Sequence, residues 1–324
     1  MSIKAIRPRK PGGPEVLKLE EHPLPEPGAG QVLVRTEAIG VNYIDVYHRT
    51  GLYKTEPPIP LGLEGAGVVE AVGADVQAPR VGERVVWSSA PGSYATHVLV
   101  PAERAVPIPA GIDSRLAAAA FLQGMTAHYL ARDTFRLGPG HVALVHAAAG
   151  GVGLLLVQLA KRAGATVFGT VSTAEKAALA RQAGADEVIL YREQDFEAET
   201  RRLTGGRGVN VVYDSVGKTT FDKSLRSLSP RGYLVLFGQS SGSVPPIDPQ
   251  VLSAGGSLFL TRPTLAHYTL DRGELLDRAR ELFDAVSSQA LHVRLAQTFP
   301  LAEARAAHEA LEGRRTTGKV LLIP

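Results

Sequence analysis

The sequence predicts an α/β protein that combines a β-rich domain with a doubly wound parallel sheet. Up to about Pro109, short runs with period-two alternation are separated by Gly and Pro turns, a pattern typical of antiparallel strands. From Leu116 onward, strand-length apolar runs alternate with helix-length segments, which predicts a parallel sheet with crossover helices. The length of 324 residues suits two domains of this kind.

In the β-rich part, we expect strands at Gln31–Ala38, Gly65–Val72 and Tyr94–Val100. In the alternating part, we expect six strands, at Val142–Val145, Thr166–Thr170, Glu187–Leu190, Val209–Tyr213, Tyr233–Phe237 and Leu258–Leu260. Helices are expected between them at Leu154–Ala163, Thr173–Gln182 and Phe221–Leu228.

The last part of the chain has a different pattern. Two amphipathic helices are expected at Glu274–Val286 and Leu301–Leu311, followed by a terminal strand at Lys319–Ile323. A six-strand nucleotide sheet has no position left for this strand, so we expect it to rejoin the first domain. The predicted domains are therefore 1–125 with 264–324, and 126–263.

A glycine turn at Ala147–Gly153 joins the first strand of the alternating part to its first helix. This is the beginning of a dinucleotide-binding βαβ unit, as in Rossmann domains. Gly150 lets the turn close, Gly151 leaves room for a pyrophosphate, and Gly153 lets the helix pack near the strand. The start of that helix offers N–H groups and a partial positive charge to phosphates.

The second strand of this unit ends at Ser172 without the carboxylate that usually holds the ribose of NAD. Ser172 can donate a hydrogen bond, and Lys176 follows one helical turn later. A missing acid with a nearby base favours the 2′-phosphate of NADPH. Alternatively, Lys176 is an ordinary exposed helix residue.

The composition excludes several classes of protein. Cysteine is absent, which excludes disulfides, thiolate catalysis and cysteine-held metal sites. The nine histidines form no metal-binding motif, and we expect no metal. The net charge is +3 without a basic block, so we expect no dedicated nucleic-acid surface. No signal peptide and no long apolar run is present, so we expect a cytoplasmic protein.

Segments spread over nearly the whole chain resemble one family. They are Gly12–Val16, Ala38–Tyr47, Gly51–Tyr53, Gly62–Gly67, His146–Gly153, Tyr213–Gly217, Phe237–Gly242 and Thr261–Pro263. They resemble the zinc-free, zeta-crystallin-like quinone oxidoreductases of the medium-chain dehydrogenase/reductase superfamily, and most of all bacterial NADPH:quinone reductases. The resemblance implies a GroES-like β-rich catalytic domain, a Rossmann domain and a homodimer. The positions of the zinc ligands in related enzymes look like Asn42, Leu63 and Glu64, and Asn and Leu cannot replace a thiolate and an imidazole.

The resemblance also implies a site. Asn42 would bond the substrate carbonyl or hold the cofactor, Tyr47 and Tyr53 would stack on a flat ring and donate hydrogen bonds, and Asp45 would orient one of these groups. The implied cofactor residues are Asn42, Thr126, Gly150, Gly151, Val152, Gly153, Ser172, Lys176, Tyr191, Ser215, Phe237, Gly238, Ser240 and Arg314. Arg315 is an alternative to its neighbour Arg314, and the tyrosines have the alternative of simple packing.

The expected function is therefore NADPH-dependent reduction of quinones, by hydride or by sequential electron transfer, without a metal. The anion of the reduced quinone is delocalised, so hydrogen-bond donors suffice to stabilise it. One alternative is a reductase of α,β-unsaturated carbonyls, which uses the same site. The other is a non-catalytic NADPH-binding protein with a structural or RNA-binding role.

Overall fold

The computed structural model describes residues 2–324 and divides the chain into two compact units. The first unit comprises the chain up to Met125 together with Thr269–Pro324. The second unit is Thr126–Tyr268. The N-terminal and C-terminal segments therefore fold together, and the middle of the chain forms a unit of its own.

The first unit is built on a seven-stranded sheet that is antiparallel except for one pair. Its order is β14-β15-β3-β4-β5-β7, and β6 also pairs with β3. The strands of this sheet are β3 (Gln31–Val41), β4 (Glu64–Val72), β5 (Arg84–Trp87), β6 (His97–Pro101), β7 (Val106–Pro107), β14 (Leu295–Pro300) and β15 (Lys319–Ile323). A separate hairpin pairs β1 (Ser2–Ile6) with β2 (Leu19–Pro23).

The α-helices of the first unit are α1 (Tyr43–Thr50), most of α2 (Ser114–Tyr129), which contains the division between the units, α8 (Arg272–Ser287) and α9 (Ala304–Glu312). The 3₁₀ helix η4 (Leu265–Tyr268) ends the second unit. The 3₁₀ turns are η1 (Pro14–Val16), η2 (Ala102–Arg104) and η5 (Leu301–Glu303).

The terminal strand β15 pairs antiparallel with β3, where Val320 faces Val41 and Leu322 faces Ile39. The prediction that this strand rejoins the β-rich part is confirmed. Apolar side chains bring it there, because Val320 and Leu322 are buried in one core cluster with Ile39 and Val41. The pairing places Lys319, the first residue of β15, beside the end of β3.

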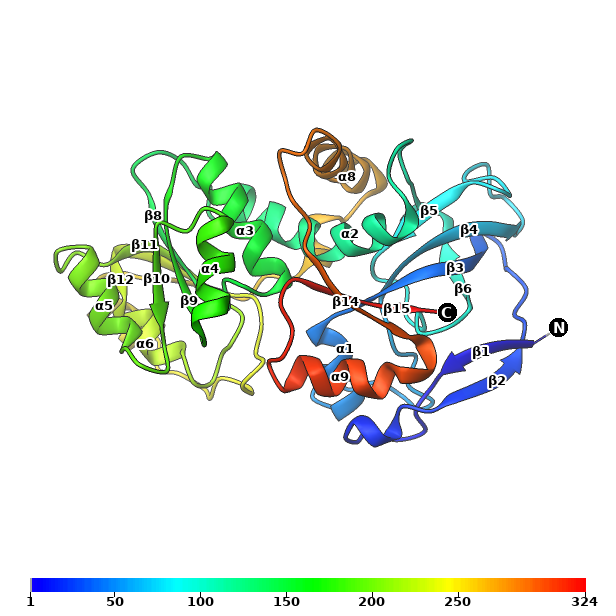
Figure 1. The fold of residues 1–324 in the computed structure, drawn as a ribbon, viewed down its shortest axis with the longest axis horizontal. Helices are drawn as coiled ribbons and strands as arrows, with labels where there is room; N and C mark the ends of the chain where they lie inside the picture. Colours follow the sequence, from blue (N-terminus) through cyan, green and yellow to red (C-terminus); the bar gives the residue numbers. More distant parts are fainter. Residues whose placement is uncertain (1) are drawn as a thin grey trace. The chain divides into compact units, whose positions relative to one another are not determined.

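The second unit is a six-stranded parallel sheet in the order β10-β9-β8-β11-β12-β13, drawn mainly in green and yellow in Figure 1. Its strands are β8 (Val142–Val145), β9 (Thr166–Val171), β10 (Glu187–Leu190), β11 (Val209–Asp214), β12 (Leu228–Leu236) and β13 (Phe259–Thr261). Its helical segments are η3 (Leu130–Thr134), α3 (Gly151–Arg162), α4 (Ala174–Gln182), α5 (Phe196–Leu203), α6 (Phe221–Arg226) and α7 (Gln250–Ala254). The predicted doubly wound parallel sheet is confirmed.

The strand order reverses between β8 and β11, because the chain winds outward to β10 and then returns. In open α/β sheets, ligands bind beyond the carboxyl ends of the strands at such a point. Helices α3 and α4 pack against β8, β9 and β10, and α6 packs against β11 and β12 (Figure 1). The loop between β8 and α3 therefore occupies the expected ligand-binding position.

Some element boundaries differ from the prediction. Leu228 belongs to β12 and not to the preceding helix, because it pairs with Val209 and is buried in the core of the sheet. Strand β6 begins at His97, since Tyr94 bonds through its N–H to Leu61. Helix α5 was not predicted: its sequence is mostly polar, and Asp195 caps its first N–H groups at 2.9 and 3.2 Å.

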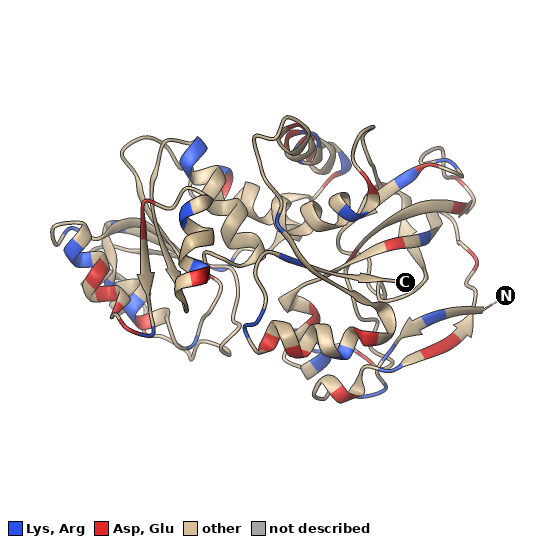
Figure 2. Cartoon of the chain, viewed as in Figure 1, with Lys and Arg blue, Asp and Glu red and all other residues tan. Residues whose placement is uncertain are grey.

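Basic and acidic residues are interspersed along the helices and strands of each unit (Figure 2). Many of them form surface ion pairs, such as Lys161 with Asp186 at 2.8 Å. None of the helices formed by residues 2–324 has both the length and the apolar character needed to cross a membrane.

Candidate functional site

The glycine turn of the second unit connects β8 to the start of α3. Ala147 has a left-handed backbone with a φ of 51°, and the Gly150 N–H bonds to its carbonyl at 2.8 Å. A Cβ on Gly153 would lie 2.3 Å from the same carbonyl oxygen, so only glycine permits this close approach. No side chain among residues 2–324 caps the start of α3. These N–H groups suit the pyrophosphate of a dinucleotide.

Three of the predicted cofactor residues lie at or just after the carboxyl ends of β9 and β10. Ser172 directly follows β9 and is buried, and Thr173 caps α4 by accepting from the Lys176 N–H at 3.4 Å. Tyr191 directly follows β10, and its N–H bonds to the Val171 carbonyl at 3.1 Å. Because β9 and β10 are parallel neighbours, Ser172, Lys176 and Tyr191 all lie on the side of the sheet where the strands have their carboxyl ends.

Four more predicted residues come together where β11 and β12 end. The Ser240 N–H bonds to the Ser215 carbonyl at 3.1 Å, and the Phe237 N–H bonds to the Asp214 carbonyl at 2.9 Å. A Cβ on Gly238 would lie 2.6 Å from the Ser215 oxygen, so this glycine lets the two turns touch. These contacts gather Ser215, Phe237, Gly238 and Ser240 beside one another.

A buried carboxylate that the sequence did not single out holds this region. Both oxygens of Asp214 are fully used: Oδ1 accepts from the N–H groups of Val216 and Gly217 at 2.7 and 3.0 Å. Oδ2 accepts from the hydroxyls of Thr220 and Ser224 at 2.7 and 2.9 Å. In the sequence, Asp214 appeared at the end of an apolar strand and within the family-like segment Tyr213–Gly217, without a role of its own.

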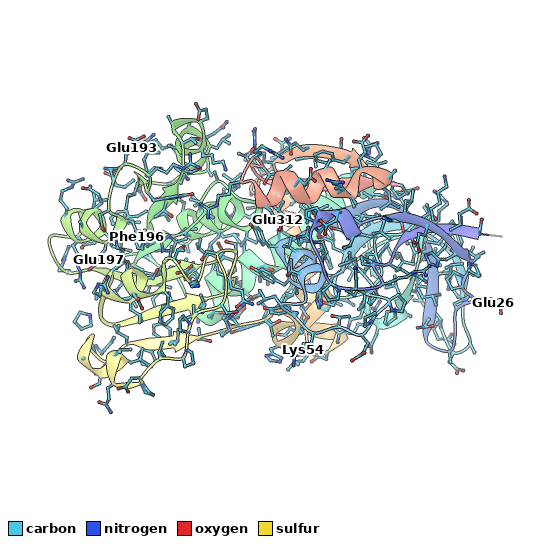
Figure 3. The ribbon with its side chains drawn as sticks, turned by 90° about the horizontal axis from the view of Figure 1, so that it is seen from below. Glu26, Lys54, Glu193, Phe196, Glu197 and Glu312 are labelled. Atoms are coloured by element: carbon cyan, nitrogen blue, oxygen red, sulfur yellow. The ribbon has the colours of Figure 1, made fainter. Side chains whose placement is uncertain are left out.

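The remaining two predicted cofactor residues, Thr126 and Arg314, are far apart in the chain and belong to different units. Thr126 is buried in α2 and is counted with the second unit. Arg314 lies in the first unit just after α9, with its N–H bonded to the Leu311 carbonyl at 3.1 Å. Burial raises the pKa of Tyr43. The charge of Glu312 raises it further, and the charge of Arg314 lowers it. Figure 3 labels Glu312 at the end of α9.

In the first unit, Asn42 lies between β3 and α1 and is buried. Its Oδ1 accepts from Lys319 Nζ at 2.9 Å and from Gln123 Nε2 at 3.2 Å. Its Nδ2 donates to Glu64 Oε2 at 2.8 Å and makes a longer contact of 3.4 Å to the Gly40 carbonyl. An ammonium can only donate and a carboxylate can only accept, so this amide has one possible orientation.

Asp45 stabilises the start of α1 from beneath. Its Oδ2 accepts from the Asn42 N–H at 2.8 Å and from the Tyr94 hydroxyl at 3.1 Å. The Asp45 side chain is fully buried, and burial raises its pKa to about 7, while these hydrogen bonds and Lys319 act in the opposite direction. The Asp45 carboxyl is therefore a weaker acid than usual, and it is hydrogen-bonded to the Asn42 backbone.

A chain of hydrogen bonds continues from Tyr94. Its hydroxyl lies 2.9 Å from Nε2 of His308, whose Nδ1 lies 3.2 Å from the guanidinium of Arg49. Because Arg49 can only donate, His308 Nδ1 accepts and Nε2 carries the proton. Burial lowers the pKa of His308 to about 3, so the ring is neutral. Arg49 in turn holds Glu312 through two bonds of 2.8 Å.

Three tyrosines follow Asn42 on α1 and the loop after it. The ring centroids of Tyr47 and Tyr53 are 5.2 Å apart, and those of Tyr43 and Tyr47 are 5.8 Å apart. The Tyr53 N–H bonds to the Tyr47 carbonyl at 3.0 Å, which fixes the loop to the helix. Asn42, Asp45 and Tyr47 thus lie at the start of α1 or on it, and Tyr53 packs against Tyr47 from the loop after the helix.

Sequence reasoning missed Glu64 and Lys319 as members of this group. Glu64 appeared only as a residue aligned with a metal position, and Lys319 only as the first residue of a strand. Both side chains are buried, and they form an ion pair with each other. Among residues 2–324, no group of three or more His, Cys, Asp or Glu side chains is placed to hold a metal ion.

Comparison with known proteins identifies the family. Residues 28–110 match the model of the alcohol dehydrogenase GroES-like domain, and residues 151–282 match that of the zinc-binding dehydrogenases. Quinone oxidoreductase 1 of Escherichia coli (strain K12) is 46% identical over 320 residues, covering 97% of this chain and 98% of that protein. This chain belongs to the quinone oxidoreductase family. The resemblance noted from the sequence is confirmed.

Two further relatives are informative. The 2-haloacrylate reductase of a Burkholderia species is 47% identical over 323 residues, with 97% of each chain covered. The crystal structure of the Escherichia coli quinone oxidoreductase complexed with NADPH has a TM-score of 0.97 and 45% identity, covering 99% of this chain and 100% of that chain. Both units of the fold are therefore shared with these enzymes.

Proposed function

We propose that this protein is an NADPH-dependent reductase whose substrates are quinones. The observation that carries the proposal is the uncapped start of α3, reached through the left-handed turn at Ala147 and the close approach at Gly153. Such a helix start binds a dinucleotide pyrophosphate. The chain shares this fold, at 45% identity, with an enzyme crystallised with NADPH.

NADPH supplies a hydride when it is bound. The N–H groups of Gly151, Val152 and Gly153 at the start of α3 would hold its pyrophosphate. Ser172 and Lys176 would hold the 2′-phosphate, and Tyr191 would offer a ring face at the same edge of the sheet. Ser215, Phe237, Gly238 and Ser240 would shape the turns at the ends of β11 and β12, with Thr126 and Arg314 as further contacts.

The substrate would bind at α1. Tyr47 and Tyr53 offer tilted rings on which a flat quinone can stack. Of the two Asn42 Nδ2 hydrogens, the one directed to the Gly40 carbonyl across 3.4 Å makes the weaker bond, and a substrate oxygen can take it. A delocalised product anion is a weak base, so one or two such donors are adequate.

A reductase of α,β-unsaturated carbonyls is the second candidate, and the 47% identity to a 2-haloacrylate reductase favours it. Such a substrate also receives a hydride at a conjugated carbon and places negative charge on oxygen. The same donor would serve it, and the two candidates differ in the shape required of the substrate site.

Steady-state kinetics separates these candidates. The purified protein would be supplied with NADPH and either 1,4-benzoquinone or 2-chloroacrylate, and each assay would be repeated with NADH. We expect turnover of the quinone with a preference for NADPH. Turnover of 2-chloroacrylate alone would favour the second candidate. NADPH binding without turnover of either substrate would contradict both and favour a structural role.

We also infer a homodimer. Strand β13 lies at the edge of the six-stranded sheet, where Phe259 is about half exposed and stacks on Tyr233. An open, apolar strand edge of this kind suits pairing with a second copy. Light scattering during size-exclusion chromatography should give twice the chain mass, and a monomer would contradict the inference.

A further inference from the structure

Lys319 and Glu64 form an ion pair inside the first unit, joining the first residues of β15 and β4. Their side chains are 1% and 0% exposed, and 255 residues separate them in the chain. Desolvating two charges is so unfavourable that a buried ion pair is often no more stable than two apolar side chains of equal volume. A contribution to the stability of the fold therefore does not explain why two charged residues are buried here.

The pair holds the Asn42 side chain from both sides. Lys319 donates to Oδ1 of Asn42 at 2.9 Å, and Glu64 accepts from Nδ2 at 2.8 Å. The other oxygen of Glu64 accepts from the Leu122 N–H in α2 at 2.6 Å. Asn42 is thereby fixed relative to β15, β4 and α2 at once.

The surrounding backbone is shaped around the two charges. A Cβ on Gly40 would lie 1.9 Å from Oε2 of Glu64 and 2.7 Å from Nζ of Lys319. Any side chain at position 40 would displace one of them. Gly40, the next-to-last residue of β3, leaves the space that the ion pair occupies, although a glycine in a strand is unfavourable in itself.

We propose that Lys319 and Glu64 are positioning residues, and that their ion pair holds the Asn42 amide in the orientation required for reduction of the substrate. This proposal rests on the proposed function, since it takes Asn42 as the donor to the substrate. The ammonium on Oδ1 also polarises the amide and strengthens its N–H groups as donors. With neutral neighbours, the amide would lose this polarisation, and only the longer bonds from Gln123 at 3.2 Å and to the Gly40 carbonyl at 3.4 Å would still favour the orientation.

The test replaces both charges together, because removing one would leave the other buried without a partner. The double variant Lys319→Met/Glu64→Gln keeps the side-chain volumes nearly unchanged. The control is Arg278→Met/Glu274→Gln, which removes another ion pair of the same unit. In that pair, a guanidinium nitrogen of Arg278 lies 2.8 Å from a carboxylate oxygen of Glu274, one turn earlier in α8. Circular dichroism and thermal melting establish that both variants are folded.

For Lys319→Met/Glu64→Gln we expect kcat with 1,4-benzoquinone to fall by about tenfold or more. A misoriented donor would no longer stabilise the negative charge that develops on the substrate oxygen in the transition state. The Kd for NADPH should stay within about twofold of the parent value, since the residues proposed to bind the phosphates are untouched. The control should match the parent protein in both quantities. A neutron crystal structure of the double variant without cofactor, which distinguishes the amide nitrogen from the oxygen, should show the Asn42 amide rotated or in two conformers.

An unchanged kcat in the folded double variant would overturn the proposal, as would an Asn42 amide that keeps its orientation in the crystal structure. A kcat loss of equal size in the control variant would also overturn it, because the effect would then be one of general stability. Failure of the proposed function is distinguishable: the parent protein itself would not reduce the quinone, whereas the Asn42 orientation can be read from the crystal structure alone.

Discussion

The carboxylate of Asp45 accepts a hydrogen bond from the hydroxyl of Tyr94 across 3.1 Å, in a fully buried position beneath the start of α1. Burial raises the pKa of Asp45 from 3.8 to about 7. The folded protein thus keeps a proton that the unfolded chain releases near pH 4. The stabilisation from Asp45 is complete below pH 4 and is lost as the pH rises through 7.

Replacing Asp45 by Asn should remove this dependence. Between pH 5 and pH 8, the free energy of unfolding of the parent protein minus that of Asp45→Asn should fall by roughly 2.5 kcal/mol. Urea unfolding at a series of pH values measures it. The exposed Asp277, paired with Arg280 on the surface, provides the control Asp277→Asn, whose difference should stay flat. A flat difference for Asp45→Asn as well would mean that Asp45 titrates normally.

The space at Gly40 predicts a large effect of a single methyl group. In Gly40→Ala, the added Cβ would meet Oε2 of Glu64 and Nζ of Lys319 at less than contact distance. We expect a loss of at least about 2 kcal/mol in the free energy of unfolding, because the buried charges must shift. In the control Gly138→Ala, the nearest atom would be 3.9 Å away. Urea unfolding that gave both variants the same stability would contradict this account of the ion pair.

The space for an added Cβ should also decide how Gly150 and Gly153, the two glycines of the α3 turn, respond to substitution by Ala. A Cβ on Gly153 would lie 2.3 Å from the Ala147 oxygen, and a Cβ on Gly150 would lie 3.1 Å from it. We therefore expect Gly153→Ala to lose roughly 1–3 kcal/mol of stability and to bind NADPH more weakly, and Gly150→Ala to be milder in both. Thermal melting and fluorescence titration with NADPH would measure these effects. Equal effects of the two substitutions would show that close packing of α3 is not what Gly153 provides.

The position of Lys176 in the first turn of α4 predicts which cofactor it distinguishes. Lys176→Glu should weaken NADPH binding at least about tenfold more than NADH binding, since a charge-assisted phosphate contact contributes about 1.5–3 kcal/mol. Arg181→Glu makes the same change of charge at the other end of α4 and should affect both cofactors equally. Isothermal titration with each nucleotide gives the ratio. If Lys176→Glu lowers both affinities by the same factor, Lys176 does not contact the 2′-phosphate.

Features that depend on neighbouring residues in the chain were predictable. The order strand, glycine turn, helix at residues 142–162 follows from local apolar patterning and from the backbone freedom of glycine. The helix expected at Thr173–Gln182, which begins at Ala174 in the structure, and the terminal strand at Lys319–Ile323 follow for the same reason. Helix α5 was missed, because its polar sequence lacks the apolar repeat and only the cap at Asp195 marks it.

The sequence by itself determined the parallel sheet and the dinucleotide-binding turn, because each is encoded in continuous segments of the chain, and the residues near α1 were expected only from the resemblance to a family. Only the tertiary structure decided that Lys319 and Glu64 meet at Asn42, since 277 residues separate Lys319 from Asn42. That meeting depends on the register of β15 against β3 and on the room that Gly40, having no side chain, leaves for the two charged groups, which no local pattern encodes. A charged residue that begins an apolar strand is usually exposed, and here the register of the sheet buries it instead.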